Sequence, residues 1–124
     1  HNKKDTLKFY KQTNINNVSQ SLIPNMFGQE YDTVNVDTIK NIMIQLGHDK
    51  IDLLKLDIEG SEVLVLEQML HDKIFPKYLC IEFDLLLKRK DYNNVTQKLV
   101  ARLQKCGYKM LINKDLNITF EYMY

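Results

Sequence analysis

Apolar and polar positions in the middle of the chain predict a strand, a helix and a second strand. In residues 51–57, "IDLLKLD", the apolar residues Ile51, Leu53, Leu54 and Leu56 give a nearly continuous apolar strand, as in a strand that is covered on both faces within a parallel sheet. Ser61 can cap the next helix, whose predicted core face consists of Val63, Leu66, Met69 and Leu70. After Pro76, residues 77–86, "KYLCIEFDLL", form the second predicted strand. A strand, a helix and a strand within about thirty residues predict a βαβ unit, and such crossovers are right-handed and parallel in nearly every known case.

Two further helices and a hairpin flank this unit. An extended "VNV" leads into a helix that Asp37 or Thr38 can cap and Gly47 ends, with an apolar face of Ile39, Ile42, Met43 and Leu46. A later helix starts at Asp91 and stops at Gly107, with an apolar face of Tyr92, Val95, Leu99, Leu103 and Cys106. The segments "YKMLIN" and "NITFEYMY" flank the turn "KDL" and predict an antiparallel hairpin.

The elements together predict a three-layer α/β arrangement in a single domain over residues 1–124. Residues 1–33 supply a short strand, "TLKFYK", and a polar, Asn-rich loop. Residues 34–124 supply the βαβ core, the later helix and the hairpin. Tyr122, Tyr124, Tyr108 and Tyr10 could stack on a sugar, but alternating aromatic residues in a closing hairpin more often form core or cross-strand pairs.

Composition and charge narrow the classes of function. Seventeen basic and sixteen acidic residues give a net charge of +1, and no basic block indicates binding to nucleic acid. No apolar run reaches the length of a membrane span. Only Cys80 and Cys106 are present, which argues against a disulfide framework and favours a reducing compartment such as the cytoplasm. The chain starts with His1, so we expect it to be part of a longer or processed protein.

Carboxylates gather where the two predicted parallel strands end. Asp57 and Glu59 follow the first strand, and Glu82 and Asp84 end the second. In open α/β sheets the ligand crevice lies outside the carboxyl ends of the strands, and such a cluster is a common way to build a general base or a metal site. A structural explanation also exists, because acids stabilise a helix N-terminus and Gly60 can serve a turn with positive φ. The spacing D-x-E-G alone does not decide between them.

Lys55 interrupts a strand that is otherwise apolar. A buried lysine needs a partner, and Glu82 holds the corresponding place near the end of the next strand. We therefore expect a buried cross-strand ion pair between Lys55 and Glu82, of the kind that is costly to break from one side.

The segments "VNVDTI", "KIDLLKLDIEGSEVLVLEQML" and "FPKYLCIEFD" resemble the FkbM-type S-adenosylmethionine-dependent methyltransferases over about residues 34–84. The family hallmark is K-[IL]-D-[IV]-E-G-x-E followed by a strand that ends in I-E. Here it is matched by Lys55, Asp57, Glu59, Gly60 and Glu62, and then by Ile81 and Glu82.

This resemblance implies the C-terminal part of a Rossmann-like methyltransferase fold, with a mostly parallel sheet and the last strand inserted antiparallel. It implies O-methylation of a small hydroxyl-bearing substrate, such as a sugar or a secondary metabolite. Asp57 is then the catalytic group nearest the transferred methyl group, and Glu59 assists it. Glu82 and Asp84 bind substrate, whereas Lys55 and Gly60 support the site.

The sequence departs from the family in its glycines. None of Gly28, Gly47, Gly60 and Gly107 lies in the G-x-G spacing of a cofactor loop. We therefore expect S-adenosylmethionine to bind through an N-terminal half that is missing here, leaving an open sheet edge and an inactive isolated chain. Two alternatives are a noncatalytic interaction module and a metal or small-ligand site in the acidic cluster. His1, His48 and His71 show no metal-ligand spacing, so no metal site is assigned.

Overall fold

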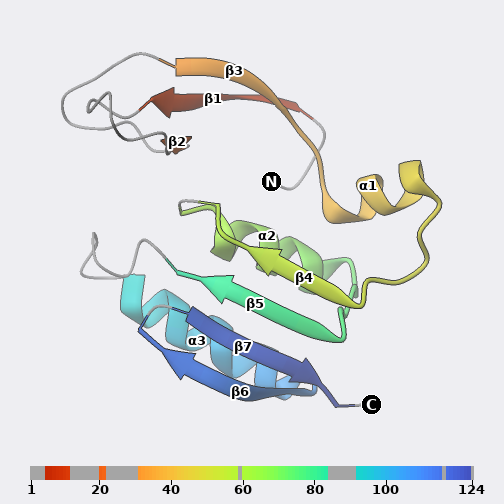
Figure 1. The fold of residues 1–124 in the computed structure, drawn as a ribbon, viewed down its shortest axis with the longest axis vertical. Helices are drawn as coiled ribbons and strands as arrows, with labels where there is room; N and C mark the ends of the chain where they lie inside the picture. The colour runs from red at the N-terminus through yellow and green to blue at the C-terminus, as the bar shows by residue number, and fades with distance from the viewer. Residues whose placement is uncertain are drawn as a thin grey trace.

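The computed structural model describes residues 5–11, 20–21, 31–58, 60–83, 92–115 and 117–123, which form a mixed α/β fold with two sheets and three helices (Figure 1). In chain order the elements are β1 (Asp5–Lys11), β2 (Gln20–Ser21), β3 (Tyr31–Val36), α1 (Ile39–Leu46), β4 (Leu53–Leu56), α2 (Glu62–His71), β5 (Tyr78–Glu82), α3 (Tyr92–Lys105), β6 (Tyr108–Lys114) and β7 (Asn117–Tyr122).

The larger sheet has four strands in the order β4-β5-β7-β6. β4 and β5 are neighbouring parallel strands, and α2 connects them in the chain, which confirms the predicted βαβ unit. β6 and β7 form the predicted hairpin, and β7 lies antiparallel between β5 and β6, as expected. The prediction of a mostly parallel sheet is wrong. A tight turn makes β7 antiparallel to β6, and β7 is also antiparallel to β5. Among the described strands of this sheet, β4 and β5 are therefore the one parallel pair.

The core lies on one face of this sheet, between the strands and two helices. Leu79, Ile81, Phe83 and Phe120 from the strands are buried against Val63, Leu66 and Met69 of α2 and against Leu99 and Leu103 of α3. Both helices lie behind the strands in the view of Figure 1. The described part of the larger sheet is therefore a two-layer structure, and the expected third layer is not observed there.

The predicted helix faces agree only in part with the structure. The core face of α2 is confirmed at Val63, Leu66 and Met69, which are buried. No residue of α1 is buried, and Ile42 and Leu46 of its predicted apolar face are 45% and 62% exposed. In α3, Leu99 and Leu103 are buried, but Val95 and Cys106 are exposed, while Thr96 joins the core side. Asp91 and the side chain of Tyr92 lie outside the described residues.

Caps define the ends of α1. The Thr38 hydroxyl accepts a hydrogen bond of 3.1 Å from the Asn41 amide, which confirms the predicted N-cap, and Gly47 ends the helix with φ +69°. Ser61 holds the N-cap position of α2, but its side chain makes no capping hydrogen bond, so this predicted role is wrong. None of the described helices has both the length and the apolar character that crossing a membrane requires.

The smaller sheet is antiparallel, with the strand order β2-β1-β3. β1 confirms the strand that was expected in "TLKFYK", and it pairs with β3 from Asp5 opposite Val36 to Tyr10 opposite Tyr31. This pairing was not predicted, because the two strands are separated by the long polar segment. The division of the chain at residue 33 stays a prediction.

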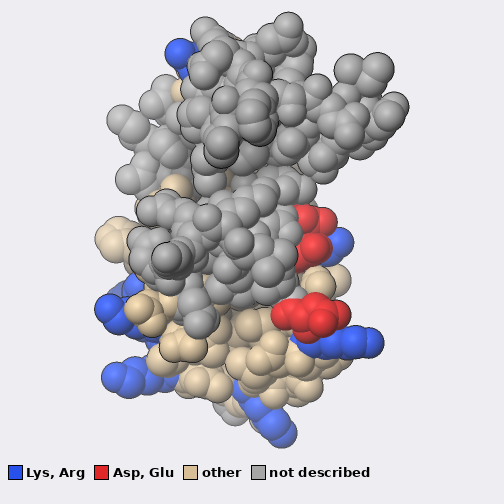
Figure 2. All heavy atoms as spheres, turned by 90° about the vertical axis from the view of Figure 1, so that its left-hand side faces the viewer, with Lys and Arg blue, Asp and Glu red and all other residues tan. Residues whose placement is uncertain are grey.

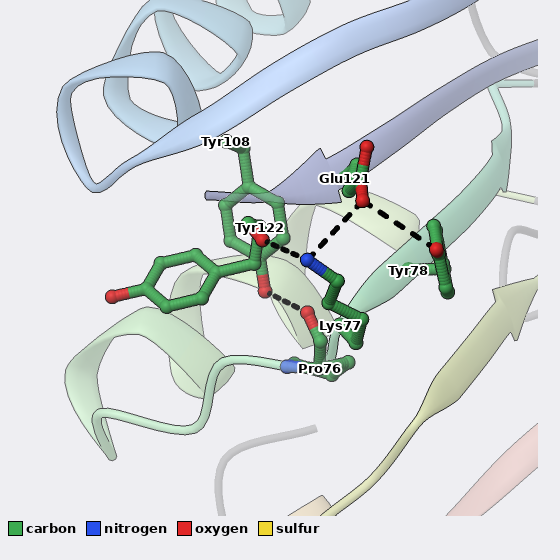
Figure 3. A network of polar contacts seen from close by, with 6 residues as sticks. All are labelled: Pro76, Lys77, Tyr78, Tyr108, Glu121 and Tyr122. Atoms are coloured by element: carbon green, nitrogen blue, oxygen red, sulfur yellow. Dashed lines mark hydrogen bonds and ion pairs between the residues drawn. The ribbon is translucent and has the colours of Figure 1, made fainter. Parts of the chain in front are cut away.

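A polar network ties the amino end of β5 to the hairpin (Figure 3). The Lys77 ammonium donates a 2.8 Å hydrogen bond to the Tyr122 carbonyl and lies 3.2 Å from the Glu121 carboxylate. The Tyr78 hydroxyl donates to the same carboxylate at 3.4 Å. On the buried side, the Tyr108 hydroxyl donates a 2.7 Å bond to the Pro76 carbonyl. These bonds connect β5, β6 and β7 at the end of the sheet opposite to Asp57.

Aromatic packing adds to this connection. The Phe75 and Tyr122 rings are stacked with their centroids 5.2 Å apart, and the Tyr108 ring lies 5.0 Å from that of Tyr122. Tyr108 is buried, so the core interpretation of Tyr108 and Tyr122 is confirmed. The side chains of Tyr10 and Tyr124 lie outside the described residues.

Candidate functional site

The parallel register places Asp57 and Glu82 side by side at the carboxyl ends of two strands. Leu56 of β4 is opposite Ile81 of β5, and each of these core residues is followed directly by one of the two acids. Because side chains alternate along strands, Asp57 and Glu82 belong to the face of the sheet away from α2 and α3. The structure thus brings together one predicted catalytic residue and one predicted substrate-binding residue. Glu59 and Asp84 lie outside the described residues.

Asn117 extends this row onto a third strand. It is the first residue of β7 and is paired with Glu82 in the antiparallel register. An exposed amide therefore lies next to the Glu82 position, where it can donate to or accept from a polar ligand. Sequence reasoning missed Asn117 as a site residue. The place of Asn117 beside Glu82 depends on the strand order, which puts β7 next to β5 and which local sequence patterns do not give.

Lys55 does not form the predicted pair with Glu82. Its side chain is 67% exposed, and its ammonium lies 3.8 Å from the Asp57 carboxylate. In the register Lys55 is opposite Cys80, one row before Glu82. The prediction assumed that β4 is covered on both faces, but in the described sheet β4 is an edge strand and its second face carries no helix. Lys55 therefore reaches a neighbour on its own strand, and this neighbour is the candidate catalytic acid.

The three strands present three rows of side chains on the open face of the sheet, and most of these side chains are polar. From the amino end of β5 toward its carboxyl end, the rows are Leu53, Tyr78 and Glu121, then Lys55, Cys80 and Thr119, and finally Asp57, Glu82 and Asn117. Figure 2, viewed from the side to which β4 and β5 point, shows acidic and basic side chains of described residues next to one another at this end. The surface suits a small polar ligand more than an apolar one.

Gly60 shapes the loop that joins β4 to α2. Its φ is +109°, a region that residues with a Cβ rarely adopt. The positive-φ explanation for this glycine is therefore confirmed. The loop is short, and the Ser61 amide donates a 3.4 Å hydrogen bond back to the Ile58 carbonyl. Asp57 is thus connected to α2 by a tight turn.

A metal site and a pocket are the other kinds of site to consider among the described residues. No three His, Cys, Asp or Glu side chains in this part of the chain come close enough to hold a metal ion. A pocket of about 390 Å³ is present, with Lys50, Ile51, Lys73 and Phe75 among its lining residues. These residues precede β4 and β5, so the pocket lies at the amino ends of the strands and does not include Asp57 or Glu82.

Comparison with known proteins identifies the family. The sequence profile described as "Methyltransferase FkbM domain" matches residues 1–110. No curated protein and no solved structure matches the chain. The matched range includes the parallel pair β4 and β5 with Asp57 and Glu82, and it ends before Asn117. Since it covers most of the 124 residues, the chain belongs to the FkbM methyltransferase family.

Proposed function

We propose that the protein is an S-adenosylmethionine-dependent O-methyltransferase whose acceptor is a hydroxyl of a small molecule such as a sugar or a secondary metabolite. The observation that supports this proposal is the parallel register of β4 and β5. In a member of a methyltransferase family, it aligns Asp57 and Glu82 at the end of the sheet where α/β enzymes bind ligands.

Asp57 is the proposed general base. S-adenosylmethionine, when bound, supplies the methyl group that moves to the acceptor oxygen. Before or during that transfer the acceptor hydroxyl loses its proton, and the Asp57 carboxylate accepts it. Glu82 is proposed to accept hydrogen bonds from neighbouring hydroxyls, with Asn117 beside it as a further polar contact. Glu59 and Asp84 remain proposed as an assisting residue and a substrate-binding residue.

The negative charges at the carboxyl ends of β4 and β5 fit part of the cofactor. S-adenosylmethionine carries a positive sulfonium and a positive amino group, and the carboxylates of Asp57 and Glu82 suit such groups. The described glycines have other uses, since Gly47 ends α1 and Gly60 shapes the β4–α2 loop, while Gly107 has φ +113° and leaves little room for a Cβ, which would lie 3.1 Å from the Tyr122 ring. We therefore assign no described residue to the adenosine part of the cofactor.

The test is methyl transfer from radiolabelled S-adenosylmethionine to a panel of methyl glycosides and phenols, using the natural protein that contains this chain. Asp57→Asn keeps the size of the side chain and removes the base, so we expect the rate to fall by about 10²-fold or more. Asp52→Asn is the matched control, because Asp52 is an exposed acid at the amino end of β4.

Equal rates for Asp57→Asn and the unmodified protein would contradict the assignment of the base. Absence of transfer to every acceptor, together with absence of cofactor binding, would contradict the enzyme proposal as a whole. That result would favour the second candidate function, a noncatalytic interaction module. The observation that favours this module is the outer edge of β4, which no strand covers in the described sheet.

A further inference from the structure

The carboxylate of Glu62 is fully buried, although the proposed reaction does not use it. Glu62 is the first residue of α2, and its side chain has 0% exposure. A buried carboxylate is costly unless hydrogen bonds replace the water that it loses. Its partners therefore indicate what this residue does.

Within the described residues, the hydrogen bonds of the Glu62 carboxylate come from the loop between β4 and α2. Oε1 accepts from the Ile58 amide at 3.0 Å and from the Gly60 amide at 3.2 Å. Oε2 accepts from the same Gly60 amide at 3.1 Å. The side chain folds back over the residues before its own helix, and two backbone amides converge on it.

This arrangement differs from ordinary helix capping. In a capping box, a glutamate in the first turn bonds the amide of the N-cap residue, and the N-cap side chain bonds an amide of the helix. Here the N-cap residue Ser61 makes no side-chain cap, and Glu62 reaches two and four residues back. The carboxylate organises the loop instead of closing the end of α2.

The bond to Ile58 acts directly on Asp57. The Ile58 nitrogen belongs to the planar peptide unit that also contains the Cα atom of Asp57. When Glu62 holds this nitrogen, it fixes the orientation of that peptide and hence the position from which the Asp57 side chain starts. The bond to Gly60 holds the other side of the same turn, where φ is +109°.

We propose that Glu62 is a positioning residue, which holds the β4–α2 loop so that the Asp57 carboxylate stays beside Glu82. The catalytic part of this inference rests on the proposed function of Asp57. A displacement of about 1 Å at a reacting group can cost roughly 10²-fold in rate. A buried carboxylate that touches no substrate can thus control the reaction through the backbone of the loop.

The first test is amide hydrogen exchange by NMR in Glu62→Gln, which keeps the size of the side chain but replaces one acceptor oxygen by a donor. We expect the Ile58 and Gly60 amides to exchange about tenfold faster or more. The amides of Leu79 and Phe120, which lie in the core sheet, report whether the whole protein is destabilised. Glu67→Gln is the matched control, because Glu67 is half exposed on the same helix and pairs with Arg102 at 3.5 Å.

The second test separates positioning from simple destabilisation. With the best acceptor from the glycoside and phenol panel, Glu62→Gln should lower kcat about tenfold or more and leave the KM for S-adenosylmethionine within about twofold. Glu62→Leu, which keeps no acceptor, should lose more activity than Glu62→Gln. If the leucine variant does not fold, the glutamine variant alone carries the comparison with Glu67→Gln.

Unchanged exchange at Ile58 and Gly60 in Glu62→Gln would overturn the proposal, and so would an unchanged kcat. Faster exchange together with a lower kcat would support it. The proposed function fails by different measurements: full activity in Asp57→Asn contradicts the assignment of the base, and absence of both methyl transfer and cofactor binding contradicts the enzyme proposal. The exchange experiment needs no activity and thus reports on the loop in either case.

Discussion

Asp57 and Glu82 are distant in the sequence and become neighbours only through strand register. The pairing of Leu56 with Ile81 is sufficient to align them, and the pairing of Glu82 with Asn117 adds the third residue of the row. Gly60 and Glu62 then determine the path of the loop that follows Asp57. At this scale each residue has a defined contact, so single substitutions can test each role.

Tyr108 illustrates the difference between a buried and an exposed hydroxyl. Tyr108→Phe removes the donor of the 2.7 Å bond to the Pro76 carbonyl and leaves that carbonyl without this partner inside the protein. We expect a loss of about 1–3 kcal/mol in the free energy of unfolding, measured by urea denaturation.

Tyr78→Phe is the matched control for Tyr108→Phe. The Tyr78 hydroxyl makes a 3.4 Å bond to Glu121 in an exposed setting, and we expect its loss to cost less than about 0.5 kcal/mol. Similar losses for the two variants would show that the buried bond does not stabilise the connection between β5 and β6.

At the scale of elements, the sequence predicted most helices and strands but not how they are covered. The periodicity of apolar residues located α1, α2, α3 and the hairpin, because each pattern is local. The predicted ion pair between Lys55 and Glu82 was wrong, because the exposure of the Lys55 side chain depends on which elements lie beside β4. The apolar face of α1 packs against the core at Ile39, whereas Ile42 and Leu46 stay exposed. Local patterns carry no information on such tertiary neighbours.

The two predicted helix caps give a direct comparison. Thr38→Ala removes the oxygen that accepts the Asn41 amide, so the first turn of α1 should lose about 1 kcal/mol. Ser61→Ala removes a side chain that makes no cap bond, so α2 should be little affected. Amide exchange in the first turn of each helix measures both changes. A larger increase in exchange rate in the first turn of α2 on Ser61→Ala than in the first turn of α1 on Thr38→Ala would contradict this assignment of the caps.

At the scale of the whole molecule, the described part consists of two sheets and has its candidate site at one end of the larger sheet. Among the candidate site residues, Asp57 and Glu82 were predicted from the strand ends, whereas Asn117 required knowledge of the strand order. Glu59 and Asp84 stay predictions. The polar network around Lys77 holds the opposite end of the larger sheet together, so the candidate site lies on strands whose other ends are fixed.

Acid should weaken the protein partly through Asp72, at the end of α2. A hydrogen bond from Gln68 lowers the pKa of this carboxyl below its usual value, and the His71 side chain and the charge of Lys40 on α1 lower the pKa further against the opposing effect of burial. Because the pKa is lower in the folded state, the stabilisation is present above the ordinary pKa of aspartate. It is lost as pH falls through the lowered pKa.

Urea denaturation of Asp72→Asn across pH tests this effect. The variant should be less stable than the unmodified protein at pH 7, and the difference should disappear in strong acid. Asp49→Asn, an exposed site, controls for the change of net charge. A difference between the unmodified protein and Asp72→Asn that stays constant down to strong acid would contradict this linkage.

Methyl transfer is proposed to take place at the carboxyl ends of β4 and β5, beside Asp57 and Glu82. NMR shift mapping during titration of S-adenosylhomocysteine into the natural protein tests it most directly, because the two ends of the sheet offer distinct reporters. We expect the amide signals of Ile58, Gly60 and Glu82 to move, while those of Ile51, Lys73 and Phe75 at the amino-end pocket do not. Movement confined to the pocket residues, or no movement at all, would contradict it.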